Sequence, residues 1–416
     1  MLTVDFKNAL SEKLKGEGLS KKEFQELQRK YQSIKSVLTQ KKQLGFIDLP
    51  YQKSTHLELL EAEAKKIRKN FQNVFIIGIG GSSLGSIALM KSLKPFQTEQ
   101  PHLFFLDNPE AGYIDFLIKN VDLSKTLLIV ISKSGGTIES LSIFSVLYAQ
   151  MLKKMGSKAK KNVVTITENN NGPLAKITRK EGFTTFEVPL NVGGRFSVFT
   201  NVGLLPAAIA GINIQKLLKG ARNTDLEMAY KLSLLQYSLY KEKGKTMTVF
   251  FPYGRILADL GDWYVQLLAE SIGKNAKVGP TPLKAVGAMD QHAQLQLFME
   301  GPNNKFHIFV EYLKTKQIRI PTLFKNEKPF EYLQGHDLHE VLLTERKGTA
   351  EALASKKRPN ITFTMEKIDE ENLGELMYLL EIEIAFLGEL FQINAFDQPG
   401  VEISKILTKQ YLSKKN

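Results

Sequence analysis

Residues 126–152 read TLLIVISKSGGTIESLSIFSVLYAQML, an apolar run that stops at a polar turn and resumes as a helix-like pattern. Runs of Leu, Ile and Val of this length are typical of a strand that is buried on both faces of a parallel sheet. Residues 73–93, NVFIIGIGGSSLGSIALMKSL, repeat the order of strand, turn and helix. Two such units predict a parallel α/β sheet that is covered by helices.

The turn within the first stretch combines hydroxyl groups with glycine, and its residues are Ser132, Lys133, Ser134, Gly135, Gly136 and Thr137. Where a strand leads into a helix, free backbone N–H groups and the helix dipole favour an anion. Two adjacent glycines let a phosphate group approach the main chain without meeting a Cβ atom. The pattern is also compatible with a simple capped helix start, because Ser and Thr are common N-cap residues.

A second turn, GIGGSSLG at residues 78–85, follows the other strand and contains Gly81 and Ser82. Its spacing does not match the dinucleotide fingerprint G-x-G-x-x-G, because residue 83 is serine. The chain also has no G-x-x-x-x-G-K-[ST] phosphate loop, which makes a nucleotide cofactor a poor alternative. Two polar turns at successive strand ends open onto one crevice, and we expect them to bind a sugar phosphate.

The composition excludes several classes of protein. The 416 residues contain no cysteine, which removes disulfides, thiolate nucleophiles and cysteine-based metal sites. The formal net charge is +13, yet the basic residues are scattered and lack the interleaved aromatic residues of a nucleic-acid-binding surface. The chain begins with charged residues, and no apolar run approaches the ~20 residues that span a bilayer. We expect a cytoplasmic protein that binds neither nucleic acid nor membranes.

Apolar β-type runs alternate with helical patterns, which predicts two doubly wound, three-layer α/β/α domains with parallel sheets. Further strands are expected at 103–107, 162–167, 184–189, 246–254, 305–313 and 360–366, and helical patterns cover 19–38, 202–240 and 370–391. We place an N-terminal helical segment at 1–55, packed on the second domain. The first domain is expected at 56–210 and the second at 211–416.

Four motifs occur in an order that resembles the glucose-6-phosphate isomerase family, and they are IGIGGSSLG (77–85), ISKSGGT (131–137), LNVGGRFSVFT (190–200) and FDQPGVEISK (396–405). The short chain is similar to the compact bacterial members of this family, also called the phosphoglucose isomerase family. The resemblance implies two sugar-isomerase (SIS) domains and a homodimer. It also implies interconversion of glucose 6-phosphate and fructose 6-phosphate, in glycolysis and gluconeogenesis, without a cofactor or a metal.

An aldose–ketose isomerase moves a proton between C1 and C2 of an open-chain sugar through an enediol(ate), which requires a base. By the resemblance, LLAESIGK (267–274) supplies this base as Glu270. Gln266 lies four residues earlier, so both side chains share one face of a helix and Gln266 is expected to contact the substrate.

The remaining catalytic residues also follow from the resemblance. The segment MDQHAQLQLF (289–298) contains His292, which by the resemblance assists ring opening. In the family this histidine can be supplied by the partner subunit, and a composite site of that kind would require a dimer. Lys405, at the end of the FDQPGVEISK motif, acts on the ring oxygen beside His292. Arg195 follows two glycines and carries a permanent charge, which is suited to stabilising an enediolate.

Three alternatives stay open. A non-catalytic SIS-type sensor of sugar phosphates would keep the hydroxyl turn but would not need the four catalytic candidates together. An isomerase that also accepts mannose 6-phosphate would differ around Gly135 and Gly136. A metal-dependent hydride shift would use His336 and His339 of GHDLHE, although no second acidic cluster of suitable spacing accompanies them.

Overall fold

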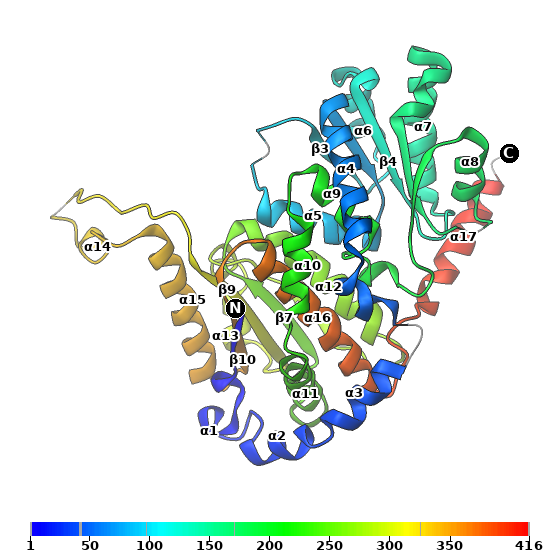
Figure 1. The fold of residues 1–416 in the computed structure, drawn as a ribbon. Coiled ribbons are helices and arrows are strands. Elements are labelled where there is room, and N and C mark those ends of the chain that lie inside the picture. The colour runs from blue at the N-terminus through cyan, green and yellow to red at the C-terminus, as the bar shows by residue number, and fades with distance from the viewer. Residues whose placement is uncertain (1, 41–43, 97, 170, 325, 415–416) are drawn as a thin grey trace.

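The first of two parallel sheets carries the two polar turns. The computed structural model describes residues 2–40, 44–96, 98–169, 171–324 and 326–414. In the first sheet all strands are parallel and their order is β3-β2-β4-β5-β6 (Figure 1). Their bounds are β2 Asn73–Ile77, β3 His102–Leu106, β4 Thr126–Ile131, β5 Val163–Thr167 and β6 Thr184–Glu187. Each of these strands was predicted from its apolar run.

The second sheet has the order β1-β10-β9-β7-β8, and only β1 runs antiparallel to its neighbour. Its strands are β1 Thr3–Asp5, β7 Met247–Pro252, β8 Thr281–Lys284, β9 Lys305–Lys314 and β10 Asn360–Lys367. The sequence predicts the three central strands but not β1 and β8. Both missed strands are short edge strands whose residues are not buried, so they have no apolar run to reveal them.

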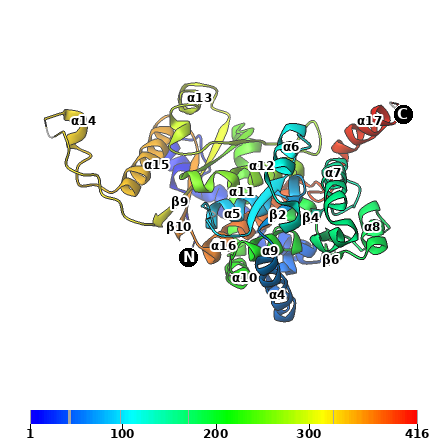
Figure 2. The same cartoon turned by 90° about the horizontal axis from the view of Figure 1, so that it is seen from above.

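Helices cover both faces of each sheet, which confirms the expected α/β fold (Figure 2). The helices in the half of the chain that forms the first sheet are α4 Ser54–Asn70, α5 Leu84–Leu93, α6 Ala111–Asn120, α7 Ile138–Met155, α8 Pro173–Glu181 and α9 Asn201–Ile209. Those of the second sheet are α10 Ile214–Arg222, α11 Leu226–Lys243, α12 Ala258–Ile272, α13 Leu295–Glu300, α15 Leu338–Ser355 and α16 Glu370–Phe391.

The helical pattern at 202–240 is divided among three helices. Gly211, with φ +78°, ends the first of them, and the side chains of Asn213 and Asp225 cap the next two by accepting bonds from backbone N–H groups. The local signals of these breaks are Gly211 and the polar run at 222–225, which the single helical pattern at 202–240 passed over.

The N-terminal segment forms α1 Ser11–Leu14, α2 Lys21–Gln28 and α3 Tyr31–Gln40. Gln28 donates a hydrogen bond to Glu227 of α11 at 2.6 Å, and Lys245 pairs with Glu17 at 3.1 Å. The helical pattern expected at 19–38 forms two helices, α2 and α3. The contact between Gln28 and Glu227 places this segment against α11 of the second sheet's half. The domain limits at 55/56 and 210/211 stay a prediction.

Short 3₁₀ helices form many of the connections, and they are η1 Lys7–Ala9, η2 Gly45–Tyr51, η3 Gly80–Ser82, η4 Leu123–Lys125, η5 Gly156–Asn162, η6 Gly194–Phe196, η7 Arg255–Leu257, η8 Met289–Gln291 and η9 Pro399–Val401. Two further helices lie at the periphery, α14 Lys328–Glu331 and α17 Glu402–Ser413. Within the described ranges, no helix is long and apolar enough to cross a membrane.

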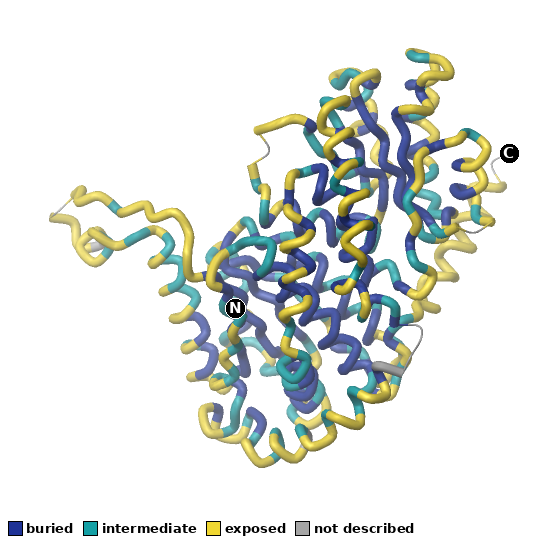
Figure 3. The backbone as a smooth tube through the Cα atoms, in the orientation of Figure 1, coloured by how far each residue is buried: buried dark blue, intermediate teal, exposed yellow. Residues whose placement is uncertain are grey.

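One continuous apolar core joins the two sheets. Val74 and Ile76 of β2 face this core, as do Phe250 of β7 and Ile308 of β9. The alternate residues of these strands face separate outer clusters beneath α6–α8 and beneath α13 and α15. The dark interior of Figure 3 follows this shared core through both halves of the molecule.

Helix α16 crosses this core and carries two carboxylates with it. Glu381 and Glu383 are fully buried, and among the described residues neither carboxylate has a hydrogen-bond partner. Burial raises the pKa of both groups well above the usual value, because a charged carboxylate is poorly solvated there.

Candidate active site

Arg195 is the centre of a polar cluster that joins η6, the end of α12 and the segment before α17. Its side chain is only 1% exposed, and it follows two glycines in η6. The Nε–H group donates to Ser271 Oγ at 2.7 Å, and Nη1 donates to Gln398 Oε1 at 2.9 Å. Nη1 also lies 3.4 Å from Glu270 Oε2. The guanidinium is thereby fixed against a carboxylate on α12.

The loop that precedes α17 supplies further acceptors for Arg195. Nη2 donates to the backbone carbonyls of Ala395 and, at 3.1 Å, Asp397. Burial lowers the pKa of the Arg195 guanidinium, and the carboxylates of Glu270 and Asp397 oppose that shift. An arginine keeps its proton in this environment, so the site contains a rigid cation.

Glu270 lies in the last turn of α12 with its side chain 32% exposed. Its Oε1 accepts a hydrogen bond from Gln266 Nε2 at 3.1 Å, while Oε2 faces Arg195. The structure therefore joins three of the predicted site residues, Gln266, Glu270 and Arg195, in one hydrogen-bonded row. The carboxylate is held in place and stays accessible from outside, which is the geometry that a general base requires.

The turn after β2 packs directly on this row. A Cβ atom on Gly81 would lie 2.2 Å from the backbone carbon of Gly194, so only glycine fits there. Ser197 Oγ donates to the Gly81 carbonyl at 3.1 Å, and half-buried Ser82 ends η3. This close approach fixes the backbone around Arg195 relative to the first sheet.

The hydroxyl turn after β4 forms a closed polar loop. Ser132 and Thr137 share a hydrogen bond of 2.8 Å between their hydroxyl oxygens, and the Gly136 N–H donates to Ser134 Oγ at 3.3 Å. Gly135 has a φ of +70°, a conformation that favours glycine. The Thr137 side chain makes no capping bond to α7, although Thr137 is the N-cap residue. This geometry weakens the interpretation of the turn as a simple helix cap.

The Lys133 side chain contacts Glu168 and Leu190, not the hydroxyl groups of its own turn. Its ammonium group lies 3.2 Å from a carboxylate oxygen of Glu168 and donates to the Leu190 carbonyl at 3.0 Å. The prediction that Lys133 binds phosphate therefore receives no support from these contacts, which already neutralise its charge.

A cavity of about 800 Å³ lies between the hydroxyl turn and α17. Its walls include Ile79, Ser134, Gly136 and Thr137 on one side and Lys405 on the other. Lys405 pairs with Glu402 at 2.7 Å and lies across the cavity from the turn, without a described contact to Arg195 or Glu270. Lys409 also lines the cavity and was not predicted.

His292 is separate from both groups. It is exposed at the end of η8, and within the described part of the chain its imidazole nitrogens have no hydrogen-bond partner. The structure of one chain does not bring His292 to Glu270. A role for His292 at this site stays a prediction.

Sequence reasoning missed two residues of the Arg195 cluster, Ser271 and Lys274. Lys274 pairs with Asp397 at 3.1 Å, and burial lowers the pKa of its ammonium group. Both residues belong to the quoted motif LLAESIGK, so their position directly after Glu270 was the available signal.

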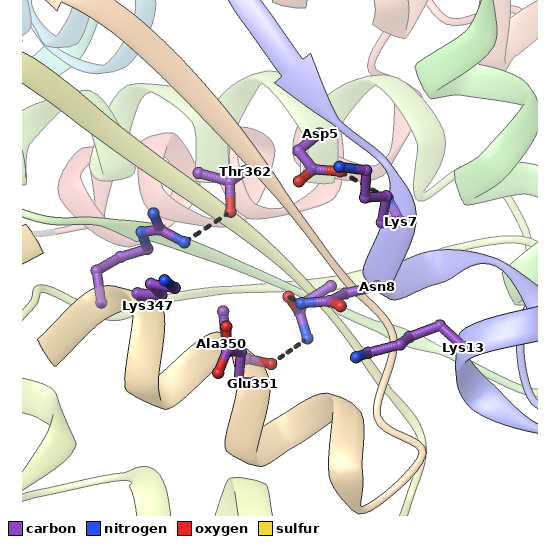
Figure 4. A pocket seen from close by; sticks show the side chains of 10 residues that line it. Asp5, Lys7, Asn8, Lys13, Lys347, Ala350, Glu351 and Thr362 are labelled. Carbon is purple, nitrogen blue, oxygen red and sulfur yellow. Dashed lines mark hydrogen bonds between the residues drawn. The ribbon is translucent and has the colours of Figure 1, made fainter. Parts of the chain in front are cut away.

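Another hollow, of about 340 Å³, lies at the edge of the second sheet between η1, α1 and α15 (Figure 4). Lys7, Lys13 and Lys347 line it together with Asp5 and Glu351, so its charges of opposite sign are mixed. None of the predicted site residues lines it, and its walls come from different elements from those that form the hydroxyl turn.

The histidines of GHDLHE have other partners. His336 pairs with Glu340 at 2.9 Å, and His339 Nε2 lies 2.7 Å from the Tyr312 carbonyl. In the residues that the structure describes, no three His, Asp or Glu side chains converge as a metal site would require.

The fold defines the class first, an α/β protein with two sheets of mainly parallel strands. The C-terminal domain of a glucosamine-fructose-6-phosphate aminotransferase from Francisella tularensis shares the fold with a TM-score of 0.51 at 14% identity, covering 85% of this chain and 96% of that chain. A family model described as phosphoglucose isomerase matches residues 62–416. The chain belongs to the phosphoglucose isomerase family.

Individual relatives agree with this assignment. A protein named glucose-6-phosphate isomerase from Carboxydothermus hydrogenoformans is 38% identical, over 99% of this chain and 95% of the relative. A protein of the same name from Rubrobacter xylanophilus is 35% identical over 98% and 97%. The crystal structure of a hypothetical protein from Thermus thermophilus superposes with a TM-score of 0.87 at 32% identity, covering 99% of this chain and all of that one.

Proposed function

We propose that this isomerase interconverts glucose 6-phosphate and fructose 6-phosphate. The observation that carries the proposal is the row of Gln266, Glu270 and Arg195, which places a held carboxylate beside a fixed cation. The family membership supports the same reaction, and the retained row argues against a sensor that only binds sugar phosphates. Interconversion of these two sugar phosphates is a reaction of glycolysis and gluconeogenesis. A cytoplasmic location stays a prediction.

In the proposed reaction, Glu270 removes the proton from C2 of the open-chain aldose and returns it to C1. The electrons of the broken C–H bond form the C1–C2 double bond of a cis-enediolate, and the π electrons of the C1 carbonyl move onto O1. The O2 proton passes to O1, and the C2 carbonyl forms as C1 takes up the proton. Arg195 stabilises the negative charge that develops on oxygen, since its guanidinium is already oriented before the reaction begins. The reverse direction uses the same groups in the opposite order.

The assay that tests this function follows formation of glucose 6-phosphate from fructose 6-phosphate in the presence of a chelator. In heavy water, deuterium should appear at C2, because Glu270 is accessible enough to exchange its proton with solvent. A product without deuterium, together with dependence on a divalent metal, would contradict Glu270 as the base. Mannose 6-phosphate as a second substrate decides whether the isomerase is strict for the C2 epimer.

We also propose that the hydroxyl turn binds the phosphate of the substrate. We expect Thr137→Val to weaken binding of fructose 6-phosphate about ten- to a hundredfold, since a hydrogen bond to a charged group is worth about 1.5–3 kcal/mol. The change appears in KM and in the inhibition constant of sulfate. Lys13→Ala, in the hollow at the edge of the second sheet, is the control that should leave both constants unchanged. Sulfate that fails to compete at high millimolar concentration would contradict the phosphate site.

We propose a homodimer with composite active sites, because the segment 315–337 and His292 are both exposed in the single chain. The described residues of 315–337, here called the arm, extend away from the body (Figure 1) and expose Leu323, Phe324 and Tyr332. Apolar side chains displayed on an extended segment favour burial against a protein surface. A second copy that takes up the arm accounts for these side chains and for the exposed position of His292.

Mixed dimers test this arrangement. We expect an inactive Glu270→Gln chain and an inactive His292→Ala chain to recover part of the activity when they are combined, because each heterodimer then contains one complete site. Native mass spectrometry verifies that heterodimers have formed. Verified heterodimers without activity would show that His292 acts within its own chain or not at all.

A further inference from the structure

Lys274 occupies an unusual position directly after α12. Its side chain is 9% exposed, and its ammonium group pairs with Asp397 Oδ1 at 3.1 Å and donates to the Asp397 backbone carbonyl. The other carboxylate oxygen, Asp397 Oδ2, accepts from Asn394 Nδ2 at 2.9 Å. Lys274 therefore attaches the segment 394–398 to the end of the helix that carries Glu270.

The segment 394–398 in turn holds Arg195. It supplies the carbonyls of Ala395 and Asp397 and the side-chain oxygen of Gln398, which together accept bonds from both terminal nitrogens of the guanidinium. The Asp397 carbonyl accepts from Lys274 and from Arg195, so two cations converge on one oxygen.

This convergence places two like charges near each other, with a carboxylate beside each of them. Burial lowers the pKa of Lys274, and the nearby Arg195 charge lowers it further, while the Asp397 and Glu270 carboxylates oppose the shift. Two cations that share one acceptor require a fixed local arrangement, and departures from ordinary packing rules concentrate at functional sites.

We propose that Lys274 is a positioning residue, which anchors the segment 394–398 so that Arg195 is held against the Glu270 carboxylate. This inference rests on the proposed isomerase function for its kinetic part. Lys274 has no contact to the Glu270 side chain among the described hydrogen bonds and acts through Asp397. Its contribution is to the orientation of the cation and not to proton transfer.

The matched variants are Lys274→Met, which keeps the length of the side chain without its charge, and Lys274→Arg, which restores a cationic donor. Lys284→Met is the control, because Lys284 pairs with Asp262 of the same helix at 2.7 Å but does not contact the segment 394–398. We expect Lys274→Met to lower kcat about ten- to a hundredfold with KM for fructose 6-phosphate within about twofold, since one charge-assisted anchor is lost.

Hydrogen exchange provides a readout that does not depend on activity. Peptides that cover 394–401 should exchange faster in Lys274→Met than in the parent protein, and Lys274→Arg should recover part of both kcat and protection. The Lys284→Met control should match the parent protein in both measurements. Full kcat in Lys274→Met, unchanged exchange, or no recovery by Lys274→Arg would overturn the proposal.

Asp397→Asn removes the charged partner of Lys274 and tests the same anchor if Lys274→Met does not fold. It should reproduce the loss of kcat and the faster exchange, and a variant with parental values in both would overturn the proposal. If the parent protein has no isomerase activity, the proposed function fails, while the exchange measurements still support or overturn the anchor.

Discussion

The Glu270→Gln variant is expected to lose kcat by about 10²–10⁴-fold, the usual cost of removing a general base. Glutamine keeps the shape of the side chain and can still bond to Gln266 and Arg195, but it cannot accept the proton from C1 of fructose 6-phosphate. KM for fructose 6-phosphate should therefore change little, because the hydroxyl turn and Arg195 are intact.

Glu366→Gln is the matched control, since Glu366 is an exposed carboxylate that pairs with Lys314 far from the α12 row. It should retain parental kcat. A Glu270→Gln variant with more than a tenth of the parental kcat would show that another group removes the proton.

Arg195→Lys is expected to lower kcat/KM about 10²–10³-fold, the range found when one preorganised donor to a developing oxyanion is removed. Lysine retains the charge but cannot donate to Ser271, Gln398 and the 395–397 carbonyls at the same time. The cation then loses its fixed orientation towards Glu270.

Arg222→Lys controls for the general cost of shortening an arginine, because Arg222 also donates to a remote carbonyl, that of Pro50, at 2.7 Å. We expect lower thermal stability without a change in kcat/KM. Equal kinetic losses in both variants would mean that Arg195 acts only through the stability of the fold.

The central strands were predictable because strands buried on both faces of a parallel sheet consist almost entirely of apolar residues, as β4 does. Edge strands carry no such signal. β8, Thr281–Lys284, contains a proline and no fully buried residue, and only its pairing with β7 identifies it as a strand.

The site was predictable where its residues lie on one element. Gln266 and Glu270 are one helical turn apart, so their contact follows from spacing. The contact of Lys274 with Asp397 joins positions 123 residues apart and depends on tertiary packing, which no local pattern encodes. Likewise, Lys133 and Lys405 lie in the expected motifs, but nearby carboxylates determine where their ammonium groups point.

The two buried carboxylates of α16 make the free energy of unfolding depend on pH, so that it decreases as the pH rises. Because burial raises the pKa of Glu381 and Glu383 above 4.5, the folded chain retains protons that the unfolded chain releases above that pH. Their contribution to the free energy of unfolding is fully present below about pH 4.5 and decreases by up to about 1.4 kcal/mol per group and pH unit until the folded-state pKa is reached. Urea unfolding between pH 5 and 9 should show this decline, and the Glu381→Gln/Glu383→Gln double variant should flatten it.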